Sequence, residues 1–279
     1  ARGLKQTGEA DRETLAAISA EIEAMQAGAE ERAKQEAEKK AQAMIDTAKT
    51  AISANWFGEF DPYDEEAAWS RLMSDITVLN VDQKEKIYLS DGPNGKRKTN
   101  DEHRGFFYGA SAHVKVLDEQ DGWSKIQAYN DYDELETGWV RPGRIKTVTP
   151  NAEYGMVVDK MAQRLYIYKE GKLLTTLLCS TGKPTKSEPY NETPAGEFII
   201  VSWTGGFWSG NMWCDMALRI NGGILVHEVP CLIRTDDNGE EYRVYSYFEE
   251  YLGQKASHGC VRVQRDKTAE GINMRWLWE

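Results

Sequence analysis

The residues with the most obvious capacity for chemistry lie near the C-terminus, in the string SHGCVR at residues 257–262. On an extended strand, residues two apart point to the same face, so we expect the imidazole of His258 beside the thiol of Cys260. Because a cysteine attacks as the thiolate, it needs a neighbouring imidazole or another electropositive group that lowers its pKa. The sequence therefore predicts a nucleophilic thiol at Cys260, with His258 and the more distant His227 as candidate bases.

Two other interpretations of these side chains stay open. In the first, Cys260 is a buried and inert thiol next to a hydrogen-bonded histidine. In the second, His227, Cys231, His258 and Cys260 form a Cys₂His₂ zinc site. Structural zinc sites normally contain tight Cys-x-x-Cys pairs, and a metal would block the nucleophile, so we expect no metal and no other cofactor.

A series of motifs upstream of Cys260 narrows the choice. Short runs bounded by turn signals predict strands, and a further glycine-led strand ends in His227. The expected strands and motifs are, in order, residues 155–159, 163–168 and 173–178, STG at 180–182, TPAGEF at 193–198, the aromatic stretch 203–213 and the strand 221–227. With the string at 257–262, this order resembles the L,D-transpeptidase catalytic domain, the YkuD family, from about residue 150 to the end. The resemblance implies a mainly β domain, a YkuD-like β-sandwich.

Enzymes of that family act on peptidoglycan stem peptides. A cysteine attacks the carbonyl of the third residue, commonly meso-diaminopimelate, the terminal D-alanine leaves, and an amine resolves the acyl-enzyme. The resemblance implies that Cys260 is the nucleophile, that His227 is the base, and that Ser257, His258 and Gly259 complete the signature. An L,D-carboxypeptidase that uses water as acceptor and a non-catalytic cell-wall-binding module are the alternatives. An NlpC-type endopeptidase fits less well, because its cysteine precedes its histidine and no histidine follows Cys260.

Each of these residues has a physical role in such a reaction. His227 would accept the thiol proton and return it to the leaving amine, while the N–H groups of Gly259 and Cys260 would stabilise the oxyanion. Arg262 would pair with a substrate carboxylate, or it is a surface arginine tied to an acidic residue. The candidate substrate-binding residues are Ser257, Arg262, Trp213, Met216 and Gly222, although core packing is the favoured role of the last three.

The segment between the two histidines departs from the family pattern. Glu228 follows His227 directly, and it either orients the imidazole or faces solvent; should it do neither, His258 becomes the better base. The insertion at 228–256 contains a turn signal at 236–239 and a tyrosine-rich run at 242–251. We interpret it as a hairpin that serves as a lid or specificity element, with a surface hairpin without a role as the alternative.

The chain has four cysteines, too few for a disulfide scaffold. Cys179 lies in an apolar strand and is expected in the core. Cys214 and Cys231 are candidates for a disulfide, which the spacing alone does not establish.

The chain before residue 150 is expected to form separate parts. Turn signals and two tryptophans predict a small β-barrel, and DGWSKIQAY at 121–129 with TGWV at 137–140 resembles a bacterial SH3-like domain. The resemblance implies binding of cell-wall peptide or positioning of the catalytic domain, with a packing spacer as the alternative. The predicted organisation is a helical arm or stalk at 1–54, a connector at 55–76, the SH3-like barrel at 77–149 and the catalytic domain at 150–279.

Within the predicted arm, apolar residues spaced three and four apart indicate a helix. They form a narrow stripe that thins before it resumes, which argues against a sustained coiled coil. The stripe consists of Leu15, Ile18, Ile22, Met25 and Ala29, and then of Met44, Ile45, Ala48 and Ile52.

Charge and hydropathy limit the partners. A net charge of −11 argues against binding of nucleic acid or anionic lipid, since both need basic patches. No apolar run is long enough to span a bilayer, so we expect no membrane span in this chain. The sequence begins without methionine or a signal peptide, and we expect an exported protein, extracellular or in the cell envelope, whose signal or anchor has been removed. Peptidoglycan stem peptides are the expected partners.

Overall fold

The computed structural model describes residues 15–29, 31–32, 34–35, 61–82, 85–98, 106–108, 113–130 and 135–279. The chain divides into two compact units, residues 1–48 and residues 49–279. In the first unit, residues 15–29 are helical, as the apolar stripe predicts. The stripe residues Leu15, Ile18, Ile22 and Met25 are exposed. The second part of the stripe, Met44 to Ile52, lies outside the described residues.

None of the described helices combines the length and the apolar composition that crossing a membrane requires.

Between residues 76 and 148, the described segments of the second unit contain short antiparallel strands. They pair as β1 with β7, β2 with β3, and β4 with β5 and β6 around a hydrophobic cluster of their own. The two tryptophans Trp123 and Trp139 lie in strands, as predicted, and are buried. The SH3-like assignment stays a prediction. The strands are β1 (Ile76–Leu79), β2 (Lys86–Tyr88), β3 (Phe106–Tyr108), β4 (Lys115–Gln120), β5 (Trp123–Tyr129), β6 (Leu135–Val140) and β7 (Ile145–Val148).

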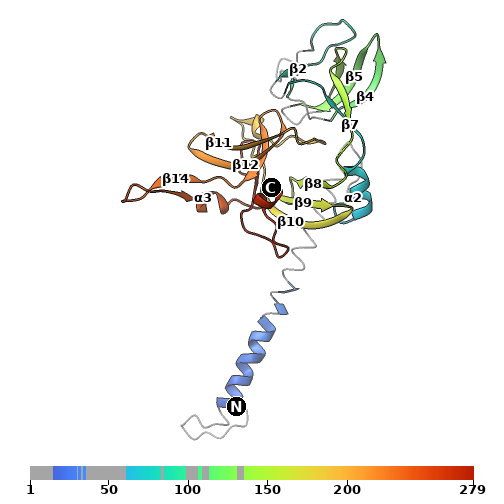
Figure 1. The fold of residues 1–279 in the computed structure, drawn as a ribbon. Helices are drawn as coiled ribbons and strands as arrows, with labels where there is room; N and C mark the ends of the chain where they lie inside the picture. Colours follow the sequence, from blue (N-terminus) through green and yellow to red (C-terminus); the bar gives the residue numbers. More distant parts are fainter. Residues whose placement is uncertain are drawn as a thin grey trace. The chain divides into compact units, whose positions relative to one another are not determined.

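Residues 150–279, all of which the structure describes, are built on one curled seven-stranded sheet (Figure 1). The strand order is β11-β12-β13-β16-β10-β9-β8, and only β13 and β16 pair in parallel. The domain is therefore mainly β, as predicted. Its strands are β8 (Tyr154–Asp159), β9 (Arg164–Lys169), β10 (Lys172–Ser180), β11 (Ser202–Ser209), β12 (Met212–Asn221), β13 (Ile224–Glu228) and β16 (Val261–Val263).

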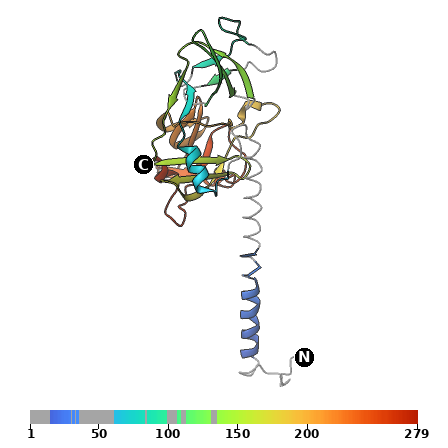
Figure 2. The same cartoon turned by 90° about the vertical axis from the view of Figure 1, so that its right-hand side faces the viewer.

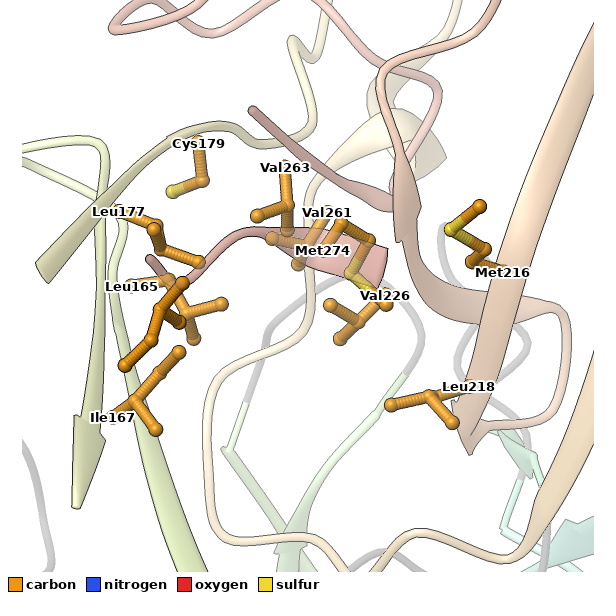
Figure 3. Close-up of a cluster of buried hydrophobic side chains, with 11 residues drawn as sticks. Leu165, Ile167, Leu177, Cys179, Met216, Leu218, Val226, Val261, Val263 and Met274 are labelled. Carbon is orange, nitrogen blue, oxygen red and sulfur yellow. The ribbon is translucent and has the colours of Figure 1, made fainter. Parts of the chain in front are cut away.

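The main hydrophobic core covers one face of this sheet. The strand register places Leu218 opposite Val226 and Val226 opposite Val261, so their side chains point to the same side. Figure 3 shows this cluster, in which Leu165 and Leu177 from β9 and β10 complete the layer. The short helix α4 (Met274–Trp278) closes it, with Met274 fully buried.

At the other end of the sheet, β9 is buried on both faces. Leu165 and Ile167 point into the main core, whereas Tyr166 and Tyr168 pack with Ala68 of helix α2 (Glu65–Leu72). Figures 1 and 2 both show α2 lying across β8–β10. This double burial explains why β9 is a continuous apolar run without alternation.

The insertion at 228–256 forms a hairpin and a short helix. β14 (Leu232–Thr235) pairs with β15 (Glu241–Val244), and helix α3 (Ser246–Glu249) follows. The predicted turn is present, since the Asp236 carboxylate accepts the N–H groups of Asn238 and Glu240 at 2.9 Å each. A 3₁₀-helix (Pro189–Asn191) precedes the TPAGEF motif.

Candidate active site

The register of the sheet assigns His227 and Arg262 to the face opposite the main core. They are direct neighbours on the parallel strands β13 and β16, one position after the core pair Val226 and Val261. Successive residues of a strand point to opposite faces, so these two polar side chains lie together on the face of the sheet away from the core. Both are buried, His227 with 2% and Arg262 with 5% of its surface exposed.

Residues 258–260 form a bend after the isolated bridge of Ser257 with Gly182, and the expectation of an extended strand there is wrong. β16 begins only at Val261, and Gly259 has φ +116°, a conformation that glycine adopts without strain. His258 is exposed, whereas Cys260 is partly buried. Because the chain bends between them, their spacing does not place the two side chains on one face.

Two hydroxyl groups hold this bend. Ser257 Oγ accepts the N–H of Gly259 at 3.1 Å and donates to the carbonyl of Cys260 at 2.5 Å. Thr193 Oγ1 donates to the carbonyl of Gly259 at 2.7 Å and accepts the N–H of Gly182 at 2.8 Å. Ser257 therefore shapes the bend, and the N–H of Gly259 is taken up within it. Of the two predicted oxyanion donors, the N–H of Cys260 is therefore the remaining candidate.

The STG and TPAGEF motifs meet at this point. A Cβ on Gly182 would lie only 1.9 Å from the carbonyl oxygen of Asn191, so the two segments approach closely because residue 182 has no side chain. Thr193 bridges Gly182 to Gly259. Thr193 is a supporting residue that the sequence did not single out, although its motif was visible.

The supporting role of Thr193 leads to a testable prediction. Thr193→Val leaves the carbonyl of Gly259 and the N–H of Gly182 buried without partners, and each such loss costs about 1–3 kcal/mol. We expect urea unfolding to show a clear loss of stability and kcat to fall, because the bend before Cys260 loosens. Thr193→Ser keeps the hydroxyl and is the matched control. A Thr193→Val protein with wild-type stability and kcat would contradict the assignment.

The Cys260 thiol lies at the β12–β13 turn. Its Sγ donates to the carbonyl of Gly223 at 3.8 Å, and the N–H of Leu225 forms a hydrogen bond to the sulfur. Burial raises the pKa of the thiol, and the Leu225 N–H and the guanidinium groups of Arg262 and Arg219 only partly offset it. Cys260 is therefore a thiol at neutral pH and needs a base before it can attack.

His227 has the properties of that base. Its Nδ1 lies 2.6 Å from the backbone carbonyl of Glu228. Because a carbonyl can only accept, Nδ1 carries the proton and Nε2 is left with a free lone pair. Burial lowers the pKa of His227 to about 4, so the ring is neutral at physiological pH. Phe207 packs edge-on against the imidazole, with ring centroids 5.7 Å apart.

Glu228 thus orients the imidazole through its backbone carbonyl. Its side chain does not face solvent: it is buried, with Arg265 at 3.9 Å, and burial raises the pKa of the carboxyl group. The sequence indicates Glu228 as a partner of the imidazole because it follows His227 directly. It does not show whether the backbone carbonyl or the side chain accepts the hydrogen bond.

The insertion is tied to the same region. Arg243 on β15 pairs with Asp215 on β12 at 3.2 Å, and Arg265 pairs with Glu249 of α3 at 3.0 Å. The guanidinium carbon Cζ of Arg262 lies over the ring of Phe248 of α3, 5.7 Å from the ring centroid. The insertion therefore covers a residue that neighbours His227.

The remaining predicted site residues are placed as follows. Arg262 is buried, so the alternative of a surface arginine is wrong. Met216 belongs to the main core, and Gly222 lies in the β12–β13 turn. Trp213 is half-buried, stacks edge-on with Trp208 at 5.4 Å and donates to Asp215 at 3.4 Å.

The cysteines outside the bend are all structural in placement. Cys179 is in the core, as predicted. Cys214 and Cys231 are buried and free, so the disulfide considered for them is not formed. In the described part of the chain, no three histidine, cysteine or acidic side chains come together in a way that would hold a metal ion.

The sheet carries a buried, neutral histidine, and a cysteine follows the glycine bend that leads into β16. These features define the class as a mainly β domain with a candidate thiol active site. Residues 153–276 match the family model of the L,D-transpeptidase catalytic domain, YkuD. This segment belongs to that family, and it contains both His227 and Cys260. A comparison with curated proteins gives no match.

Proposed function

We propose that this protein is an L,D-transpeptidase that cross-links peptidoglycan through a thioester on Cys260. The observation that carries the proposal is His227: within a YkuD domain, a buried imidazole with a protonated Nδ1 and a pKa of about 4 is a base at neutral pH. His227 lies beside Arg262 on the face opposite the core, and Arg262 is two residues after Cys260 in the chain.

In the proposed reaction, His227 Nε2 takes the proton of the Cys260 thiol as sulfur attacks the carbonyl carbon of the third stem residue. The negative charge develops on the carbonyl oxygen, for which the N–H of Cys260 is the proposed donor. The C–N bond to the terminal D-alanine then breaks, and His227 returns the proton to the leaving amine. An amine of a second stem attacks the thioester, its proton passes through His227, and Cys260 leaves as the thiol.

The insertion is proposed as a lid or specificity element over this site. The stacking of Phe248 on Arg262 supports this role, because a substrate that contacts the guanidinium must meet α3. The ion pairs of Arg243 and Arg265 hold the hairpin and the helix in place. The β unit before residue 150 is proposed to bind cell-wall peptide or to position the catalytic domain, and the site of action is proposed to be the cell envelope.

The test follows the protein and a diaminopimelate-containing tetrapeptide stem by intact mass spectrometry. We expect an acyl adduct on Cys260, released D-alanine and peptide dimers. Tripeptide without dimers would replace the transpeptidase by an L,D-carboxypeptidase. Neither adduct nor product, with binding of cell-wall material retained, would replace the enzyme by a binding module.

A further inference from the structure

Arg219 lies near Cys260, and its guanidinium is one of the charges that lower the pKa of the thiol. It lies on β12 opposite Leu225 of β13, the residue whose N–H reaches the Cys260 sulfur. Its neighbour Leu218 points into the core, so Arg219 points to the same face as His227 and Arg262. An arginine thus flanks Cys260 from each of two strands.

Neither arginine has a carboxylate partner in the part of the chain that the structure describes. Other arginines do, for example Arg243 with Asp215 and Arg265 with Glu249. The chain has 45 acidic residues and a net charge of −11, so carboxylates are abundant. Their absence at Arg219 and Arg262 is therefore a specific feature of this face.

The donors of the two guanidinium groups are largely unused. Arg219 donates from Nη1 to the carbonyl of Gly222, but its buried Nε has no partner among the described residues. Arg262 has only 5% of its surface exposed, and its guanidinium contacts the ring of Phe248. Burial lowers the pKa of Arg262, which reflects the missing counter-charge.

The buried guanidinium of Arg262 and the buried Nε of the half-buried Arg219 have no anion beside them, and a bound carboxylate would offset their desolvation cost. Arginine also matches a carboxylate with two parallel hydrogen bonds. We propose that Arg219 and Arg262 together form a subsite that binds a carboxylate of the donor stem beside Cys260. This inference rests on the proposed function and extends it from one arginine to a pair on two strands.

Two carboxylates of a tetrapeptide donor belong to the residues that flank the cleaved bond: the C-terminal group of its D-alanine and the side-chain group of its diaminopimelate. The first is on the leaving residue, and the second is on the residue whose carbonyl Cys260 would attack. An enzyme that removes one terminal residue must recognise the end of the chain, which the first source would explain. The second would select the side chain.

The first experiment changes the substrate and leaves the protein intact. Wild-type protein is given the tetrapeptide, its C-terminal amide and its side-chain amide, and kcat/KM is measured for each. We expect one amide to lose about ten- to a hundred-fold, the size of a lost charge-assisted pair, and its position identifies the source. Equal kcat/KM for all three peptides would overturn the subsite.

The second experiment changes the arginine. Arg219→Gln should lower kcat/KM for the carboxylate donor by a similar factor and leave the sensitive amide nearly unchanged, so that the preference disappears. Arg275→Gln, at an exposed arginine of α4 outside the insertion, is the matched control and should keep the preference. An equal loss on all peptides, with slower alkylation of Cys260 by iodoacetamide, would show that Arg219 acts on the thiol and would overturn the subsite.

Two further measurements keep the outcomes apart. Should Arg219→Gln protein fail to fold, Arg219→Lys provides a variant that keeps the positive charge. We expect it to retain part of the preference for the carboxylate donor over the sensitive amide. Calorimetric binding of the three peptides to Cys260→Ala protein needs no turnover. If wild-type protein turns over no stem peptide, the proposed function fails; if it turns over all of them alike, only the subsite fails.

Discussion

Cys260→Ala is expected to abolish acyl-enzyme formation and to lower stem-peptide turnover by more than about 10⁴-fold, because no other group can form the thioester. Among the four cysteines, only Cys260 is more than marginally exposed. The substitution removes one sulfur from a bend that Ser257 and Thr193 hold through backbone atoms, so the fold should persist. Intact mass spectrometry and a turnover assay measure the two effects.

Cys179→Ala is the control for this experiment. It removes a thiol from the same domain, but from the core face of β10, and burial raises the pKa of that thiol. We expect a modest loss of stability with the acyl adduct intact. Turnover that survives in Cys260→Ala protein would contradict the thioester route, and an adduct that disappears in Cys179→Ala protein would point to another nucleophile.

The strands of the catalytic domain were predictable because their signals are local. Apolar runs bounded by turn residues predicted β8, β9 and β10, and the glycine-led run predicted β13 with His227 near its end. The order of the motifs in the sequence also indicates the family. The turn of the insertion was equally clear, since Asp236 caps it through neighbours within four residues.

The conformation at 257–260 was not predictable from local spacing. Gly259 takes a positive φ in a bend fixed by Thr193, which lies 66 residues earlier in the chain. Contacts between distant segments leave no periodic pattern in the sequence. For the same reason, the backbone acceptor of His227 and the stacking of Phe248 on Arg262 became visible only in the structure.

Arg219 is a different case, because the sequence contained a signal for it. It is a charged residue in a strand whose neighbours are apolar, directly after the core residue Leu218. Strand alternation would have placed it on the face opposite the core. Arg219 lies between the motifs that carry the family resemblance, at 203–213 and 221–227, and belongs to neither.

The choice between the two histidines is the second prediction with a large effect. His227→Gln is expected to lower kcat/KM by about 10²- to 10⁴-fold, the usual contribution of a general base. Glutamine can still donate to the Glu228 carbonyl, so the strand should keep its place, while the lone pair of Nε2 is lost. His258→Gln should cause a far smaller loss, because that side chain is exposed on the bend.

The pH profile distinguishes a base at His227 from a base at His258 without any substitution. His227 has a pKa lowered to about 4 by burial, so its neutral form, the base, is lost only as the pH falls through 4. An ordinary imidazole would lose it near 6.5. Because burial also raises the pKa of Cys260, no thiolate limb is expected in the neutral range.

We therefore expect kcat/KM of the wild-type protein to stay level from about pH 5 to pH 8 and to fall below that range, as the free-enzyme pKa requires. His258→Gln should leave the profile unchanged. An acid limb well above pH 4 that disappears in His258→Gln protein would make His258 the base, and the buried histidine would then be a structural neighbour of Arg262. The two variants and the profile together identify the ring that accepts the proton, because burial keeps His227 neutral down to about pH 4.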